Sequence, residues 1–150
     1  MNVFEKIIEK LYLHIDNNLV FYDSVSTCKS RYYYDHVAKE KYNSKNCCVI
    51  FVDINNMKKI NDTKGHAYGT ALIKQVGQSL LNIKGVFDVC RIGGDEFVVF
   101  ANNDINFKEL MAVPYIAHGC FYKSPNETVD QAVQRADALM YIRKNQIKNK

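Results

Sequence analysis

Apolar residues recur at helical spacing near both ends of the chain. Phe4, Ile8 and Leu11 are three or four positions apart, which predicts an amphipathic helix over residues 3–16. Similar patterns predict helices over 31–42 and 128–144. Because nothing upstream can cover the first helix, we expect it to pack on its own domain or on a second copy. Residues 1–20 are therefore predicted as a separate helix and a candidate dimerisation element.

The central part of the chain carries strand patterns. Residues 47–54 are a continuous apolar run of strand length, typical of a central strand that is buried on both faces. Residues 86–90 and 97–101 flank a short turn and predict a hairpin, and 113–122 predict another strand. A helix over the stretch that contains Leu72, Val76 and Leu80 separates the first strand from the hairpin. We therefore expect an α/β domain with a mixed, mostly antiparallel sheet flanked by helices.

Composition narrows the class of protein. A chain of 150 residues with 47% hydrophobic and 24% charged residues is typical of one globular domain. Glu5, Glu9 and Asp16 interrupt the first apolar pattern, which argues against a signal peptide or a membrane span. The five cysteines are scattered without metal-binding spacing, so we expect reduced thiols and a cytoplasmic location without a membrane partner. The net charge of +4 suits an anionic ligand but also fits a solvated helix face.

The hairpin turn holds an unusual group of residues. Two glycines precede two acids in RIGGDEF, residues 91–97, and Asp53 ends the buried strand. If these elements are neighbours, Asp53, Asp95 and Glu96 converge at one edge of the sheet, where their repulsion favours a bound cation. Magnesium suits such oxygen ligands, and two ions are suited to nucleotidyl transfer. Gly93 and Gly94 are expected to supply special backbone angles and to let a ribose or phosphate approach the main chain. An ordinary hairpin turn with solvated acids is the alternative.

A resemblance to a known family supports the first of these interpretations. The segments RIGGDEF, DIN with Lys58, INDTKGHAYG (60–69) and RADALMYIRKNQIKN (135–149) are similar in order and spacing to motifs of the GGDEF family, the diguanylate cyclases. DSVSTCKSRYYYD (23–35) resembles the opening motif of that family less closely. The resemblance implies a palm-like GGDEF domain over residues 21–150. It also implies a homodimer that joins two nucleoside triphosphates into a cyclic dinucleotide and releases pyrophosphate.

The same resemblance implies roles for individual residues. Asp53 and Asp95 would bind two Mg²⁺ or Mn²⁺ ions with help from the carbonyl of Ile54. Glu96 would complete the metal and catalytic site and aid deprotonation of the 3′-hydroxyl. Nucleotide binding would fall to the following residues: Asn61 at the purine edge, Gly94 at the turn, Thr70 near the base, and Lys58, Lys144 and Lys148 at the phosphates.

Three departures from the family pattern change these expectations. Thr70 stands where the family has an aspartate that accepts hydrogen bonds from guanine, so base choice is expected to relax from GTP toward ATP. Lys84 and Phe87 replace the arginine and aspartate of the product-inhibition motif, so feedback by that route is not expected. The segment between Phe97 and the strand at Tyr115 is short, which predicts a deleted or reduced helix and a partly uncovered sheet face.

Two other functions remain open. One is an inactive nucleotide-binding sensor with a retained pocket, and the other is an interaction module in which the acids only form a turn. The intact pair Asp95 and Glu96 favours the cyclase. A nucleic-acid template is not expected, because the chain lacks an extended basic and aromatic surface. A separate protein regulator is compatible with the sequence.

Overall fold

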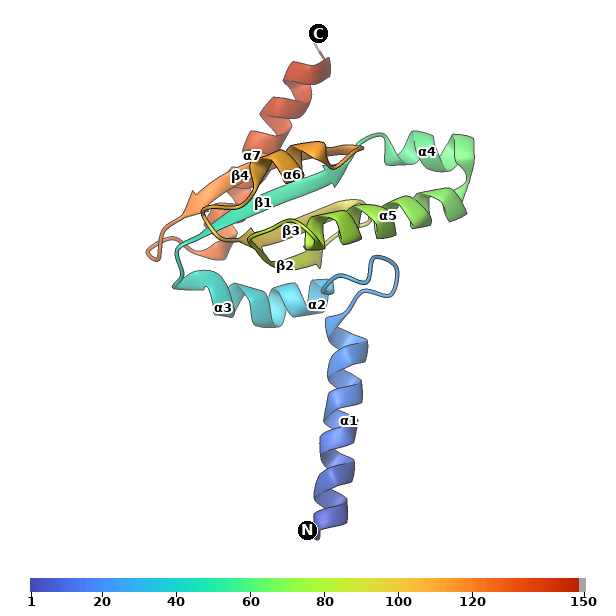
Figure 1. Cartoon of the computed structure of the whole chain (residues 1–150), viewed down its shortest axis with the longest axis vertical. Coiled ribbons are helices and arrows are strands. Elements are labelled where there is room, and N and C mark those ends of the chain that lie inside the picture. Colours follow the sequence, from blue (N-terminus) through green and yellow to red (C-terminus); the bar gives the residue numbers. More distant parts are fainter. Residues whose placement is uncertain (149–150) are drawn as a thin grey trace.

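A four-stranded sheet forms the middle layer of the molecule (Figure 1). The computed structural model describes residues 1–148, apart from the side chains of Asp16, Ile147 and Lys148. The strand order is β2-β3-β1-β4, with bounds of β1 Cys47–Ile54, β2 Val86–Arg91, β3 Glu96–Ala101 and β4 Ile116–Lys123. Each pair of neighbouring strands in this order is antiparallel. The hairpin prediction is confirmed, whereas the expected mixed sheet is in fact antiparallel.

Helices cover both faces of the sheet. Helices α5 and α6 pack on one face, and α2, η1, α3 and α7 pack on the other. Helix α4 leads from β1 into α5 (Figure 1). The bounds are α2 Arg31–Tyr33, the π-helical turn η1 Tyr34–Ala38, α3 Lys39–Asn43, α4 Met57–Lys64, α5 His66–Leu81, α6 Phe107–Ala112 and α7 Val129–Lys148. The helices predicted over 31–42 and 128–144 are thus confirmed.

Strand β1 divides the core into two clusters. Ile50 and Val52 point toward α5, whereas Val49 and Phe51 point toward α7, and all four are buried. This alternation arises because successive side chains of a strand point to opposite faces. The prediction of a central strand buried on both faces is confirmed. Asp53, the next residue along, continues the second set and faces the α7 side.

The reduced helix after the hairpin is present as α6, which has six residues. Leu110 and Val113 are nevertheless buried against the sheet, so this short helix covers β1 and β3. The expectation of a partly uncovered sheet face is therefore wrong for the inner strands. Half-buried apolar residues lie on the edge strands, such as Cys120 on β4 and Val86 on β2. Strand β4 starts at Ile116, later than predicted, because Tyr115 adopts a left-handed conformation with φ 67°.

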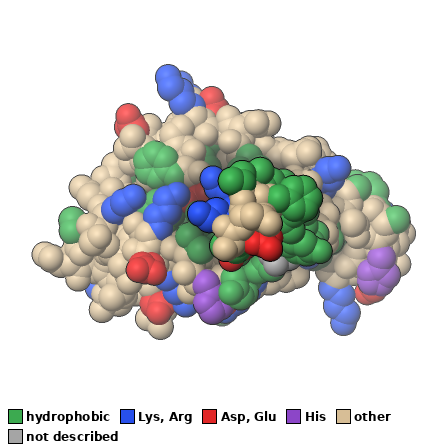
Figure 2. Space-filling view, turned by 90° about the horizontal axis from the view of Figure 1, so that it is seen from below, with side chains coloured by type: hydrophobic (Ala, Val, Ile, Leu, Met, Phe, Trp, Pro, Cys, Tyr) green, Lys and Arg blue, Asp and Glu red, His purple; other side chains and the backbone are tan. Residues whose placement is uncertain are grey.

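Helix α1, Val3–Phe21, projects away from the domain (Figure 1). It runs beyond the predicted end at residue 16 and begins at a capping box formed by Asn2 and Glu5. Figure 2 looks onto this helix and shows hydrophobic side chains gathered on it. Phe4 and Leu19 are 71% and 75% exposed, so the domain does not cover these side chains. Among the described residues, no helix combines the length and apolar character needed to cross a membrane.

Candidate functional site

The pairing of β1 with β3 brings the predicted acids together. Asp53 lies directly opposite Glu96 in the register, and such pairs on antiparallel strands point to the same face. The backbone N–H of Ile54 donates to the carbonyl of Asp95 at 2.9 Å, which fixes the end of β1 against the turn. The three carboxylates therefore lie at one edge of the sheet, as the sequence predicts.

Electrostatic effects at this edge are unfavourable for the negative charges. Burial and the charge of Asp53 raise the pKa of Asp95, and burial with both neighbouring acids raises the pKa of Glu96. Lys144 Nζ donates to Asp53 Oδ2 at 2.8 Å and offsets part of the charge. The other oxygen, Asp53 Oδ1, is buried and has no hydrogen-bond partner. A buried carboxylate oxygen without a donor costs free energy unless another group binds it.

The orphan oxygen of Asp53 fits a divalent cation. Carboxylate oxygens are hard ligands, and Mg²⁺ commonly takes one or two of them and completes its coordination with water and substrate phosphates. Within the described residues, no group of three or more His, Cys, Asp or Glu side chains is arranged to hold a metal by itself. The acids would therefore supply only part of the ligands of a metal ion, and a phosphate ligand would complete them.

The two glycines of the turn were predicted to supply special backbone angles and to let a ligand approach the main chain, and only the first of these expectations is contradicted. Neither has a positive φ, because the glycines with positive φ among the described residues are Gly65 and Gly85. The expectation of special backbone angles is therefore wrong. A Cβ added at Gly93 would lie 2.8 Å from Glu96 Oε2, so this glycine makes room for the carboxylate. A Cβ at Gly94 would meet nothing within 4 Å, which leaves the main chain there open to a ligand.

A cleft of about 450 Å³ opens between α4, the start of α5 and the hairpin turn. It is lined by Met57, Lys58, Asn61, Asp62, His66, Thr70, Ile73, Arg91, Gly94 and Asp95. Five of the predicted nucleotide and metal residues thus share one cavity. Asn61 fits closely against α5, because a Cβ at Gly69 would lie 2.0 Å from Asn61 Oδ1. Replacing Gly69 would displace this amide.

The remaining predicted residues lie beside the cleft rather than in its lining. Asp53, Glu96 and Lys144 gather on the α7 side of the sheet edge, where Lys144 contacts Asp53. The side chain of Lys148 lies outside the described residues. The structure therefore separates the predicted phosphate lysines, with Lys58 in the cleft and Lys144 against an acid.

Comparison with known proteins settles the family. A family model described as "Diguanylate cyclase, GGDEF domain" matches residues 20–117, about two thirds of the chain. The chain belongs to the GGDEF family. The match includes β1, the cleft and the RIGGDEF hairpin, so the resemblance found in the sequence is confirmed for all three.

Relatives of this GGDEF chain include a diguanylate cyclase and a cyclic di-GMP phosphodiesterase. Diguanylate cyclase DgcS of Shewanella oneidensis is 27% identical over 142 residues, covering 80% of this chain and 48% of the relative. Cyclic di-GMP phosphodiesterase PdeR of Escherichia coli is 39% identical over 70 residues, covering 46% of this chain and 10% of the relative. The GGDEF chain thus spans less than half the length of these curated relatives.

The fold of the GGDEF chain also matches solved structures. The coiled coil and GGDEF domain of DgcB from Caulobacter crescentus, solved in complex with c-di-GMP, aligns with a TM-score of 0.77 at 18% identity. The alignment covers 95% of this chain and 91% of that chain. At this identity the likeness establishes the α/β GGDEF fold, with its antiparallel four-stranded sheet flanked by helices.

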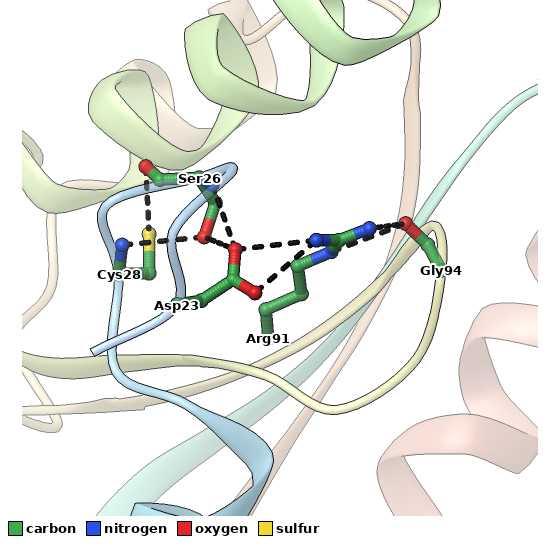
Figure 3. Close-up of polar contacts among 5 residues, drawn as sticks. All are labelled: Asp23, Ser26, Cys28, Arg91 and Gly94. Atoms are coloured by element: carbon green, nitrogen blue, oxygen red, sulfur yellow. Dashed lines mark hydrogen bonds and ion pairs between the residues drawn. The ribbon is translucent and has the colours of Figure 1, made fainter. Parts of the chain in front are cut away.

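Sequence reasoning missed one residue of the GGDEF cleft that makes several contacts. Arg91 Nε and Nη2 donate to the carbonyl of Gly94 at 3.2 and 2.8 Å, and Nη1 donates to both carboxylate oxygens of Asp23 at 3.2 Å (Figure 3). Both residues belong to motifs that the sequence marks, because Arg91 opens RIGGDEF and Asp23 opens DSVSTCKSRYYYD. Their pairing across 68 positions could not be inferred from spacing, since it depends on the tertiary fold.

Proposed function

We propose that this GGDEF domain is a metal-dependent cyclic dinucleotide synthase of the diguanylate cyclase type. It would condense two nucleoside triphosphates and release pyrophosphate. The observation that carries this proposal is the buried, unpartnered Oδ1 of Asp53, next to Asp95 in the wall of a cleft that also presents Lys58 and Asn61. If the acids of the hairpin only formed a turn, the buried Asp53 oxygen without a hydrogen-bond donor would have no explanation.

Asp53 and Asp95, with the Ile54 carbonyl and Glu96, would hold two Mg²⁺ or Mn²⁺ ions. Bound metal would acidify the 3′-hydroxyl and neutralise charge on the leaving pyrophosphate. Burial and the neighbouring acids raise the pKa of Glu96, which makes this carboxylate a better proton acceptor than an ordinary glutamate. Lys58 in the cleft would contact the phosphates of the bound triphosphate.

The phosphate role of Lys144 requires a change of partner. Its ammonium group lies 2.8 Å from Asp53 Oδ2, where it offsets the carboxylate charge. Lys144 is 28% exposed, so its flexible side chain has room to turn toward a phosphate. Lys148 is proposed to assist from the next helical turn, on sequence grounds alone.

The base would be read beside α4 and α5. Asn61 and Thr70 both line the cleft, which supports a contact of both with the base of a bound ligand. A hydroxyl at position 70 pairs less well than a carboxylate with the two donors of guanine, which would cost about 1.5–3 kcal/mol of guanine preference. We therefore propose that ATP is accepted with or instead of GTP.

Two copies of the domain would be needed, because each cleft holds one triphosphate. Helix α1 offers a surface for pairing: Phe4, Ile8, Leu11 and Ile15 are spaced by four and three residues, which is the coiled-coil pattern. Their side chains are between 38% and 71% exposed. The solved DgcB chain carries a coiled coil next to its GGDEF domain. We propose that α1 pairs two protomers in this way.

The alternative is a nucleotide-binding sensor without turnover, regulated by or acting on another protein. The similarity to the cyclic di-GMP phosphodiesterase PdeR favours this alternative. The intact acids and the open Gly94 turn favour the cyclase.

Product analysis tests the two functions. Purified protein would be incubated with Mg²⁺ or Mn²⁺ and GTP, ATP or both, without nucleic acid, and analysed by mass spectrometry. A cyclic dinucleotide that is absent from the Asp95→Ala variant would establish the synthase, and its bases would report the selectivity. Bound triphosphate without product would instead support the sensor.

A further inference from the structure

The edge strand β4 carries polar and nucleophilic groups that do not line the nucleotide cleft (Figure 1). His118, Cys120 and Tyr122 are two residues apart along β4, so they point to the same face of the sheet. The register pairs Cys120 with Ile50 and Tyr122 with Cys48, which brings a second thiol to this face. Cys48, Cys120 and His118 are here called the thiol cluster.

Cys120 interacts with both other members of the thiol cluster. Its Sγ lies 3.9 Å from Nδ1 of His118, and the Cys48 thiol donates a hydrogen bond to it. This hydrogen bond and burial raise the pKa of Cys48, so Cys48 stays protonated and remains the donor. Cys48 and His118 are buried, whereas Cys120 is half-buried. Cys120 is therefore the thiol of the cluster that solvent reaches.

The charges around the cluster favour a thiolate at Cys120. The hydrogen bond from Cys48 lowers the pKa of Cys120 to about 6, and His118 and the Arg143 charge add to it against the effect of burial. Arg143 belongs to α7 and reaches α6 on the other face of the sheet, where Nη2 donates to Sδ of Met111 at 3.0 Å. Burial and the two thiols raise the pKa of Tyr122, so this phenol stays neutral. Cys120 is thus ionised at neutral pH.

The two thiols are in contact but are poorly placed for a disulfide. Diagonal neighbours on antiparallel strands have Cα atoms about 7–8 Å apart, whereas a disulfide spans about 4.4–6.8 Å. Strand β1 is fixed between β3 and β4. Helix α7 packs so closely on β4 that a Cβ added at Gly119 would overlap the carbonyl of Ala136. Because neither strand has room to shift, Cys48 serves as a donor to Cys120 and not as its disulfide partner.

We propose that Cys120 is a site of reversible oxidation by hydrogen peroxide or another small hydroperoxide, and that its product is a sulfenic acid. The thiolate sulfur attacks one peroxide oxygen, so an S–O bond forms while the O–O bond breaks. With hydrogen peroxide, the second oxygen leaves as hydroxide and takes a proton from water. The sulfur loses two electrons, and the peroxide is reduced to water.

The thiol cluster suits this product as well as the reaction. A sulfenic acid is commonly lost when a neighbouring thiol condenses with it to a disulfide. Cys48 is the neighbouring thiol, and the sheet keeps it from that geometry. A small external thiol can still reach the half-buried Cys120, form a mixed disulfide with it and restore the thiol in a second exchange.

The experiment uses the full, reduced chain without nucleotide at pH 7. Hydrogen peroxide is added together with dimedone, which traps sulfenic acids, and peptide mapping follows the adduct at each cysteine. We expect Cys120 to be trapped about tenfold or more faster than Cys28, Cys47 or Cys90, whose thiols are buried and have raised pKa values. In urea the rates should converge, since the fold creates the difference.

Two variants at Cys48 test the role of the donor. Cys48→Ala removes the hydrogen bond and should slow trapping at Cys120 about threefold or more. Cys48→Ser keeps a donor and should stay near the wild-type rate. Cys47→Ala is the matched control, because Cys47 is equally buried but lies on the opposite face of β1. Thermal unfolding of each variant reports whether it is folded.

Trapping at Cys120 that is no faster than at the buried cysteines would overturn the inference. A disulfide between Cys48 and Cys120 as the main product of the wild type would overturn it too, as would an effect of Cys48→Ala no larger than that of Cys47→Ala. If Cys48→Ala does not fold, the wild type and Cys48→Ser decide: both should give the dimedone adduct at Cys120 at similar rates.

Discussion

Two carboxylates, the buried Asp88 and the half-buried Asp53, lie near opposite ends of the same sheet face and differ in their hydrogen-bond partners. Asp88 on β2 accepts from Tyr42 Oη at 2.6 Å, Lys41 Nζ at 3.0 Å and Tyr33 Oη at 3.2 Å. Asp53 on β1 has one donor, and its Oδ1 has none. Where a carboxylate serves the fold, the surrounding residues satisfy it. The unsatisfied one marks the place where a ligand is expected.

The donors around Asp88 are themselves kept in the right protonation state. Burial, together with the neighbouring Asp88 charge, raises the pKa of Tyr33 and Tyr42, so both phenols stay protonated and continue to donate. The Asp53 end has the opposite character, because burial and like charges oppose ionisation of Asp95 and Glu96. The acid at one end of the sheet accepts three hydrogen bonds, whereas the acids at the other end repel one another and would be stabilised by the proposed cation.

The largest expected effect is on catalysis at Asp53. Asp53→Asn should lower the rate of product formation about 100-fold or more, since it removes the proposed metal ligand, which would contribute several kcal/mol in the transition state. Its melting temperature should stay the same or rise, because the repulsion with Asp95 and Glu96 disappears. Mass-spectrometric turnover and thermal unfolding measure the two quantities. A loss of stability as large as that of Asp88→Asn would break the comparison.

The next effect is on stability at Asp88. Asp88→Asn should lower the free energy of unfolding by about 2 kcal/mol, because three hydrogen bonds to a charged group weaken. Urea denaturation measures this loss, and the variant should keep its triphosphate affinity. Tyr33→Phe is a milder control that removes one donor and should cost about 1 kcal/mol. An Asp88→Asn variant with wild-type stability would show that the network is not structural.

A smaller effect is expected for the stabilisation by Mg²⁺, which should differ between variants at Asp53 and at Asp88. Magnesium at about five times its dissociation constant should stabilise the wild type by about 1 kcal/mol, since only the folded state binds it. Asp53→Asn should lose this stabilisation, whereas Asp88→Asn should retain it. Thermal unfolding with and without Mg²⁺ gives the result. Equal stabilisation of both variants would place the cation elsewhere.

The smallest expected effect concerns the reactivity of the cysteine thiols, whose pKa values also differ between regions of the sheet. Burial and the Asp88 charge raise the pKa of Cys90, and burial raises the pKa of Cys28 to about 11. Contacts with the Cys48 thiol and the His118 imidazole lower the pKa of Cys120 to about 6. Because the thiolate is the nucleophile, iodoacetamide should label Cys120 first.

The labelling rate at Cys120 should rise as pH increases through about 6 and level off above it, since the thiol is then fully ionised. Peptide mapping after alkylation at several pH values follows this, with Cys120→Ser as the control. A rate that keeps rising beyond pH 8 would contradict the lowered pKa.

Much of the fold could be predicted because local patterns were long and regular. The apolar run of β1 gave its bounds to the residue, and α7 and the hairpin differed from prediction only at their ends. The start of β4 was missed because the left-handed Tyr115 interrupts an apolar run that otherwise looks continuous. The backbone angles expected at Gly93 and Gly94 were wrong, because a glycine in a turn does not by itself reveal whether it supplies an angle or space.

The sequence by itself determined the family, the elements and the residue types of the site, because periodicity and motifs are local properties of the chain. Only the tertiary structure decided which charges meet. The register of β1 against β3 placed Asp53 opposite Glu96, and the packing of α7 brought Lys144 to Asp53. The path of residues 22–30 joined Asp23 to Arg91. Contacts between residues so far apart depend on how whole elements pack, and no local pattern encodes that.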